Sequence, residues 1–162
     1  TQIGPVVDQA QLDQDLAYLR IAQEEGGRLV AGGERVERET PGFFLQPALI
    51  TETTNAMRIN REEVFGPVAS VIRVKDYDEA LATANDTEFG LLAGIWTRDG
   101  GRQTRMAKKM QCGQVYLNCY GAGGGVELPF GGYKKSGHGR EKGFLALEEF
   151  CIIKTIVQYH GE

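Results

Sequence analysis

The sequence has 162 residues, of which 41% are hydrophobic and 25% are charged, so it is long enough and apolar enough to bury a core. Its formal net charge is -4, and Lys and Arg do not cluster on a predicted face, which argues against nucleic acid as a partner. No apolar run approaches the roughly 20 residues of a membrane helix, and the N-terminus has no signal-like segment, so we expect a cytoplasmic protein without a membrane partner.

The first expected elements are a helix and a hairpin. Over residues 8–25, apolar side chains recur every three or four positions, which predicts an amphipathic helix that ends at a Gly-Gly pair. The stretch RLVAGGERV, residues 28–36, predicts a short β-hairpin around its central glycines. GFFLQPALIT, residues 42–51, predicts an extended segment in which Pro47 favours an edge position or an interruption.

Strands and helices then alternate along the chain. VASVIRV, Val68–Val74, is nearly continuously apolar, as a parallel-sheet strand covered on both faces would be. The following elements are expected to be a helix at 76–86, a strand at 92–97, a helix at 99–113 and a strand at 114–120. This order predicts an α/β fold with parallel strands joined by right-handed crossovers.

The last part of the chain is glycine-rich before it closes with a helix and a strand. Residues 121–139 form a loop too long to be a simple connection, which is typical of a functional segment. Their glycines are not followed by a helix, so they do not match a dinucleotide-binding fingerprint. REKGFLALEEF, residues 140–150, predicts a short helix, and CIIKTIVQY, residues 151–159, a final strand.

Cysteine and histidine are too sparse to indicate a metal site or a disulfide framework. Cys112, Cys119 and Cys151 are odd in number and widely spaced, which fits a reducing compartment. The histidines, His138 and His160, are too few for a metal cluster, so we expect no bound metal. A Cys-His pair, as in a cysteine hydrolase, stays open, although nothing in the spacing selects it.

EEVFGPV, residues 62–68, places carboxylates and an aromatic ring just before an apolar strand. A carboxylate could accept two hydrogen bonds from the vicinal hydroxyls of a ribose, and Phe65, two residues beyond Glu63 on an extended chain, would lie on the same side against a planar ring. Gly66 would permit close backbone approach. The other interpretation, a solvated turn with Phe65 as a core anchor, is favoured on the residues alone.

A resemblance that extends over the whole chain favours the ligand-binding interpretation of residues 62–68. EEVFGPV, NCYGAGGG, ELPFGGYKKSGHGRE and KTIVQY, in this order, resemble the carboxyl-terminal third of the NAD(P)-dependent aldehyde dehydrogenase superfamily over essentially the whole chain. The resemblance implies part of the catalytic domain, a Rossmann-like layered parallel sheet, over residues 1–150 and an oligomerisation strand over 151–162. It also implies a parent enzyme that oxidises an aldehyde to a carboxylic acid with NAD or NADP, and that forms a homo-oligomer, a dimer or tetramer, through the last strand.

The resemblance assigns two residues to the cofactor. Glu63 falls on the glutamate that accepts hydrogen bonds from the nicotinamide ribose, and Phe65 falls on the phenylalanine beside the nicotinamide. Glu62, the neighbouring carboxylate, is the less suitable ligand.

The resemblance places further residues at the aldehyde pocket. Phe130 matches a phenylalanine that walls the substrate tunnel. Tyr120 and Gly121 belong to the loop at its mouth, which here lacks a bulky aromatic residue that some relatives carry, so we expect a roomier entrance or a loop that orders on binding. Glu141 matches a glutamate of a water-linked proton path; the alternative is a first-turn helix residue favoured by the helix dipole.

The catalytic centre of this superfamily lies upstream of the resembling segment. Its nucleophilic cysteine, general-base glutamate and main nucleotide-binding domain have no counterpart here, and the three cysteines present are better interpreted as structural thiols. The sequence also opens at TQIGPVVD without a methionine, as a piece of a longer polypeptide would. We therefore expect this chain to be inactive alone; the alternative is an autonomous, non-catalytic oligomerisation or ligand-binding module.

Overall fold

The computed structural model describes residues 3–120 and 125–161. The chain divides into two compact units, Thr1–Thr83 and Ala84–Glu162. No linker-like composition marks the boundary between them.

The first unit opens with helix α1, Gln9–Glu24, as the apolar spacing predicts. The side chain of Asp8 caps its N-terminus by accepting a 2.8 Å hydrogen bond from the backbone N–H of Gln11. At the other end, Gly26 takes a positive φ of 102°, which terminates the helix. One face of α1 is buried along its whole length, through Leu12, Asp15, Leu19 and Ala22.

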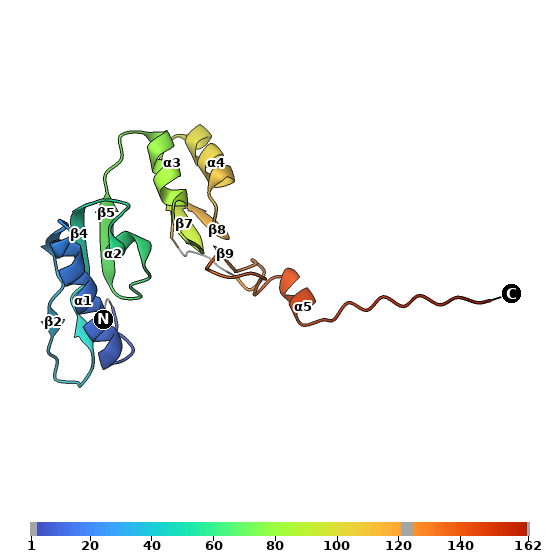
Figure 1. The fold of residues 1–162 in the computed structure, drawn as a ribbon, viewed down its shortest axis with the longest axis horizontal. Helices are drawn as coiled ribbons and strands as arrows, with labels where there is room; N and C mark the ends of the chain where they lie inside the picture. The colour runs from blue at the N-terminus through green and yellow to red at the C-terminus, as the bar shows by residue number, and fades with distance from the viewer. Residues whose placement is uncertain (1–2, 121–124, 162) are drawn as a thin grey trace. The chain divides into compact units, whose positions relative to one another are not determined.

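A three-stranded sheet packs beside α1 (Figure 1). Its strand order is β1, β4, β5, with β1 antiparallel and β5 parallel to the central β4. The strands are β1 (Arg28–Ala31), β4 (Ala48–Thr53) and β5 (Val68–Ile72), and the short helix α2 (Arg58–Arg61) lies in the connection between the parallel pair. Leu19 and Ala22 of α1, Ala48 and Ile50 of β4, and Ile59 of α2 form the buried core.

The hairpin predicted at 28–36 is wrong. Strand β1 pairs with β4, whereas β2 (Arg35–Val36) pairs with β3 (Phe44–Leu45). Gly32 instead allows two backbone segments to lie close together, because a Cβ at Gly32 would lie 1.9 Å from the carbonyl oxygen of Pro47. Pro47 itself separates β3 from β4, so it marks an interruption, and the strand after it is central in its sheet.

Strand β5 confirms the parallel pairing but not the expected covering of both faces. Its residues alternate between partly buried and exposed, because it lies at the edge of this sheet and only one face packs on the core. Helix α3, Tyr77–Asn85, follows and spans the boundary between the units. Asp76 caps it, accepting a 2.9 Å hydrogen bond from the N–H of Glu79.

The second unit repeats the strand-helix-strand arrangement. Strands β7 and β8 are parallel and are joined by helix α4, as predicted, while β6 and β9 form a separate antiparallel pair. The elements are β6 (Phe89–Gly90), β7 (Leu92–Ile95), α4 (Gly100–Lys109), β8 (Gln114–Leu117), β9 (Tyr133–Lys134) and the short α5 (Leu145–Glu149). The α/β class is thus confirmed, with two parallel strand pairs in separate mixed or small sheets.

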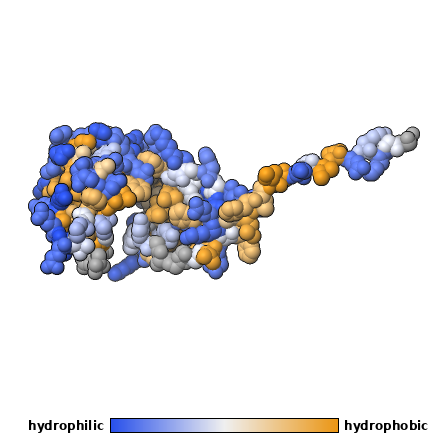
Figure 2. Space-filling model, turned by 90° about the horizontal axis from the view of Figure 1, so that it is seen from below, coloured by the Kyte–Doolittle hydropathy of each residue, from blue (hydrophilic) through white to orange (hydrophobic). Residues whose placement is uncertain are grey.

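The C-terminal segment, residues 151–161, forms no strand in the single chain. Figure 2 shows its apolar side chains open to solvent between polar ones, and Ile153, for example, is 94% exposed. A strand needs a neighbour for its backbone hydrogen bonds, so the expected pairing with another subunit stays a prediction. Among the residues that the structure describes, no helix has the length and apolarity to cross a bilayer.

Candidate functional site

The two adjacent glutamates between α2 and β5 have different surroundings. Glu62 accepts hydrogen bonds of 2.8 and 2.9 Å from the guanidinium of Arg58 and one of 2.6 Å from the hydroxyl of Tyr18. The guanidinium of Arg58, followed by the hydroxyl of Tyr18, lowers the pKa of Glu62 to about 2. Both oxygens of Glu62 are therefore occupied within the protein.

Glu63 is the carboxylate that remains available. It is exposed, and across residues 3–120 and 125–161 it makes no hydrogen bond or ion pair. Its two oxygens can accept the two hydrogen bonds that a vicinal diol donates. The structure therefore distinguishes the two glutamates, which the sequence pattern alone does not.

Phe65 presents its ring to solvent from an unusual backbone conformation. Its side chain is 76% exposed, so Phe65 is not a core anchor in this chain. Its φ is 61°, in the left-handed region, so the backbone is not extended there and the alternation expected from Glu63 to Phe65 is wrong. A non-glycine residue in this region costs about 1–2 kcal/mol, which the surrounding contacts must offset.

Helix α1 supplies those contacts. The carbonyl oxygen of Val64 accepts hydrogen bonds from the side-chain amides of Gln11, at 2.9 Å, and Gln14, at 3.0 Å. Val64 lies between Glu63 and Phe65, and its carbonyl group belongs to the peptide that links it to Phe65. The helix therefore anchors the backbone between the two candidate residues. Neither glutamine is marked by a sequence pattern, because polar residues on an amphipathic helix are ordinarily solvated.

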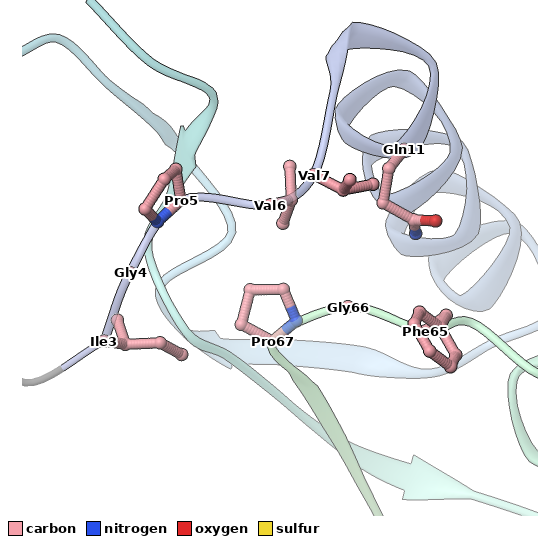
Figure 3. A pocket seen from close by; sticks show the side chains of 9 residues that line it. All are labelled: Ile3, Gly4, Pro5, Val6, Val7, Gln11, Phe65, Gly66 and Pro67. Atoms are coloured by element: carbon pink, nitrogen blue, oxygen red, sulfur yellow. The ribbon is translucent and has the colours of Figure 1, made fainter.

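A hollow of about 380 Å³ lies beside Phe65, one of the two candidate cofactor residues. Figure 3 shows the N-terminal segment and Gln11 on one side of it and the Phe65–Pro67 segment on the other. Its lining consists of Ile3, Gly4, Pro5, Val6, Val7, Gln11, Phe65, Gly66 and Pro67. Because almost all of these residues are apolar, the hollow suits the flat or apolar part of a ligand.

The second unit brings two other candidate residues together. Phe130 and Glu141 form an isolated antiparallel bridge, in which the N–H of Phe130 donates to the carbonyl of Glu141 at 2.6 Å and the reciprocal bond measures 2.7 Å. The ring of Phe130 is partly buried, with Lys142 Nζ 5.5 Å from its centroid. Glu141 is exposed and precedes α5 by several residues, so the interpretation as a first-turn helix residue is wrong.

Tyr120 stands at the end of the described part of its loop. It is 66% exposed, and its ring centroid lies 6.3 Å from that of Tyr116. Before it, the side chain of Asn118 makes two hydrogen bonds with the backbone of Thr97, of 2.9 and 3.0 Å, which tie the end of β8 to the chain after β7. Gly121, the other residue expected at the tunnel mouth, lies outside the described residues.

The cysteines do not assemble into a reactive centre. Cys112 is partly buried, its thiol donates to the carbonyl oxygen of Gln114 at 3.1 Å, and burial raises its pKa, which disfavours the nucleophilic thiolate. Cys119 is partly buried and Cys151 exposed, and no hydrogen bond joins either to His138 in the described parts of the chain. Within those parts, His, Cys, Asp and Glu form no group of three or more suited to a metal ion.

Comparison with known proteins gives consistent matches. Residues 1–156 match the aldehyde dehydrogenase family. Betaine aldehyde dehydrogenase of Brucella anthropi is 45% identical over 164 aligned residues, covering 100% of this chain and 34% of the relative. The chain therefore spans about one third of the length of the curated relatives it matches.

Solved structures agree with this match. The crystal structure of an indole-3-acetaldehyde dehydrogenase complexed with NAD+ superposes with a TM-score of 0.88 at 40% identity, covering 93% of this chain and 30% of the other. The aldehyde dehydrogenase KauB from Pseudomonas aeruginosa gives a TM-score of 0.88 at 43% identity, with the same coverage of 93% and 30%.

Proposed function

Because this chain belongs to the aldehyde dehydrogenase family, we propose that it is the part of an NAD- or NADP-dependent enzyme that holds the nicotinamide end of the cofactor. The parent enzyme oxidises an aldehyde to a carboxylic acid. The observation that carries the proposal is the contrast between two neighbours: Arg58 and Tyr18 occupy Glu62, whereas Glu63 keeps both oxygens available.

Glu63 and Phe65 form the cofactor clamp. The carboxylate of Glu63 would accept hydrogen bonds from the ribose hydroxyls, and the exposed ring of Phe65 would hold the nicotinamide and exclude water from it. When bound, the cofactor accepts the hydride that leaves the substrate carbon. The NAD+ complex of a structural relative supports NAD+ as the cofactor.

Residues of the second unit contribute to the substrate side. Phe130 walls the aldehyde tunnel, Tyr120 and Gly121 shape its mouth, and Glu141 belongs to a proton path that leads away from the reaction centre. The backbone bridge between Phe130 and Glu141 supports this grouping, because it fixes the two residues next to each other.

This chain alone does not turn over aldehyde in our proposal. The nucleophile and the general base belong to polypeptide outside it, and Cys112, with its raised pKa, is unsuited to replace the nucleophile. Residues 1–150 act as part of the catalytic domain, and residues 151–162 pair as a strand with another copy to form a dimer or tetramer. All three cysteines lie in the described parts of the chain and are free, which supports a cytoplasmic location.

The clamp is tested by the variant Glu63→Gln in the full-length enzyme. Losing hydrogen bonds to a charged acceptor costs ~1–3 kcal/mol, so the dissociation constant for NAD+ or NADP+ and the corresponding KM rise together. Glu24→Gln, which changes an exposed glutamate of α1, is the control and leaves both unchanged. Unchanged rates and cofactor binding in Glu63→Gln would remove the assignment. Betaine aldehyde, named for several relatives, is the first substrate to assay.

A further inference from the structure

Helix α1 carries a carboxyl group in an unexpected place. Asp15 is 0% exposed, and its Oδ1 accepts a 2.7 Å hydrogen bond from Gln11. Its Oδ2 has no hydrogen-bond partner in the part of the chain that the structure describes. Burial raises the pKa of this carboxyl group, against the smaller opposing effect of the bond from Gln11. Burying a polar oxygen without a partner is unfavourable, so the presence of Asp15 requires another explanation.

Asp15 presses on the backbone of Gly66. A Cβ built at Gly66 would lie 2.2 Å from Oδ1, 2.3 Å from Cγ and 2.3 Å from Oδ2 of Asp15, and these are its three nearest atoms. Gly66 is not among the glycines with a positive φ, so a left-handed backbone does not account for glycine at this position. The carboxyl group of Asp15 is therefore the reason that position 66 cannot carry a side chain.

The contacts of Asp15 enclose Phe65 on both sides. On one side, Asp15 contacts Gly66, the residue directly after Phe65. On the other side, Gln11 donates both to Asp15 and to the carbonyl oxygen of Val64, the residue directly before Phe65. The left-handed conformation of Phe65 persists only if such contacts determine its backbone. Because Asp15 has no exposed surface, its side chain packs against residues of this chain and not against solvent.

We propose that Asp15 is a positioning residue for the cofactor clamp: its side chain, wedged between Gln11 and Gly66, fixes the backbone of Phe65 and thereby the ring that meets the nicotinamide. This inference rests on the proposed function, because it gives Asp15 a role only if Phe65 contacts the cofactor. The shape of the carboxyl group, rather than its charge, fixes the backbone of Phe65.

The test compares Asp15→Ala and Asp15→Asn in the full-length enzyme. Asp15→Ala removes the wedge, so the dissociation constant for NAD+, followed by protein fluorescence, and the KM for NAD+ rise roughly 10-fold, while the KM for the aldehyde stays the same. Asp15→Asn keeps the planar group and restores cofactor binding to within about twofold of wild type. Asp13→Ala, at an exposed carboxylate of the same helix, is the control and binds NAD+ normally.

A reciprocal pair of variants tests the contact itself. Gly66→Ala adds a methyl group against Asp15 and weakens NAD+ binding. In the Asp15→Ala background the same change costs less, because the methyl group occupies the space that the carboxyl group has left. An equal loss of affinity in both backgrounds, or normal NAD+ binding in Asp15→Ala, would overturn the proposal.

Two further results distinguish a failure of the proposed role of Asp15 from a failure of the proposed cofactor clamp. If Glu63→Gln weakens NAD+ binding and Asp15→Ala does not, the clamp stands and the role of Asp15 is wrong. If neither changes NAD+ binding, the clamp fails and the inference fails with it. Should Asp15→Ala not fold, Gly66→Ala alone decides, because normal NAD+ binding in that variant contradicts a wedge at position 66.

Discussion

The hydroxyl of Tyr18 on α1 donates a 2.6 Å hydrogen bond to Glu62, the residue directly before the candidate cofactor ligand. Together with the two bonds from Arg58, it holds this carboxylate against the first unit. Glu63 is the next residue, and it therefore extends from an anchored position. Glu62 thus anchors the segment, whereas its neighbour Glu63 is the candidate cofactor ligand.

Acid should release this anchor only at low pH, after carboxylates with ordinary pKa values have been protonated. The pKa of Glu62 falls from 4.5 to about 2, because Arg58 and then Tyr18 stabilise the ionised form. A depressed pKa gives stability that is fully present above pH 4.5 and disappears as the pH falls to about 2. We expect wild type to lose its advantage in unfolding free energy over Glu62→Gln within that window, measured by denaturant unfolding. A constant difference between the two proteins across the window would contradict the interpretation.

Asp15 should give the opposite pH dependence. Burial raises its pKa above the ordinary 3.8, so the folded protein holds this proton more tightly than the unfolded chain does. Wild type is therefore most stable relative to Asp15→Asn below pH 3.8, and it loses stability relative to that variant as the pH rises through the folded-state pKa. Denaturant unfolding of both proteins over this range checks the sign, and Asp13→Asn should follow wild type throughout.

Lys134 should stabilise the second unit more than its neighbour does. Its ammonium donates to the carbonyl oxygen of Asn85, the last residue of α3, at 2.7 Å and to that of Thr87 at 2.9 Å. Lys134→Met leaves these carbonyls without their donor and should lower the unfolding free energy by ~1–3 kcal/mol. Lys135→Met breaks only an exposed ion pair with Glu88 and should cost about 0–1 kcal/mol. Equal losses in thermal or denaturant unfolding would argue against the internal role of Lys134.

The C-terminal segment should control the oligomeric state. Ile153 is 94% exposed in the single chain, so a charge there costs little until the segment pairs with another copy. Ile153→Lys in the full-length enzyme should therefore shift the assembly toward monomers, as measured by light scattering during gel filtration. Gln158→Lys, a polar position of the same segment, is the matched control. An unchanged molar mass for Ile153→Lys would place the interface elsewhere.

The sequence predicted those elements whose determinants are local. Helix α1 follows from apolar spacing and the Asp8 cap, and the parallel pair of β7 and β8 follows from the alternation of strands with α4. The hairpin at 28–36 failed because Gly32 serves a contact with Pro47, which no local pattern records. The strand expected at 151–159 does not form in the single chain, and its pairing with another copy stays a prediction.

The candidate site was predictable in its ligands but not in its support. The family motif proposes Glu63 and Phe65 as ligands, and these roles stay predictions. The left-handed backbone of Phe65 depends on contacts with α1, about fifty positions earlier in the sequence, which no local pattern indicates. One signal was present. Asp15 interrupts the apolar series that Leu12, Leu19 and Ala22 define, and an acid on the buried face of a helix indicates a special contact.

The two hydrogen bonds to the carbonyl oxygen of Val64 restrict the motion of its peptide plane. Two amide donors occupy both lone pairs of that oxygen, so the peptide plane between Val64 and Phe65 cannot flip unless both bonds break. A shift of α1 that keeps both hydrogen bonds would therefore move this peptide plane, and with it the backbone of Phe65.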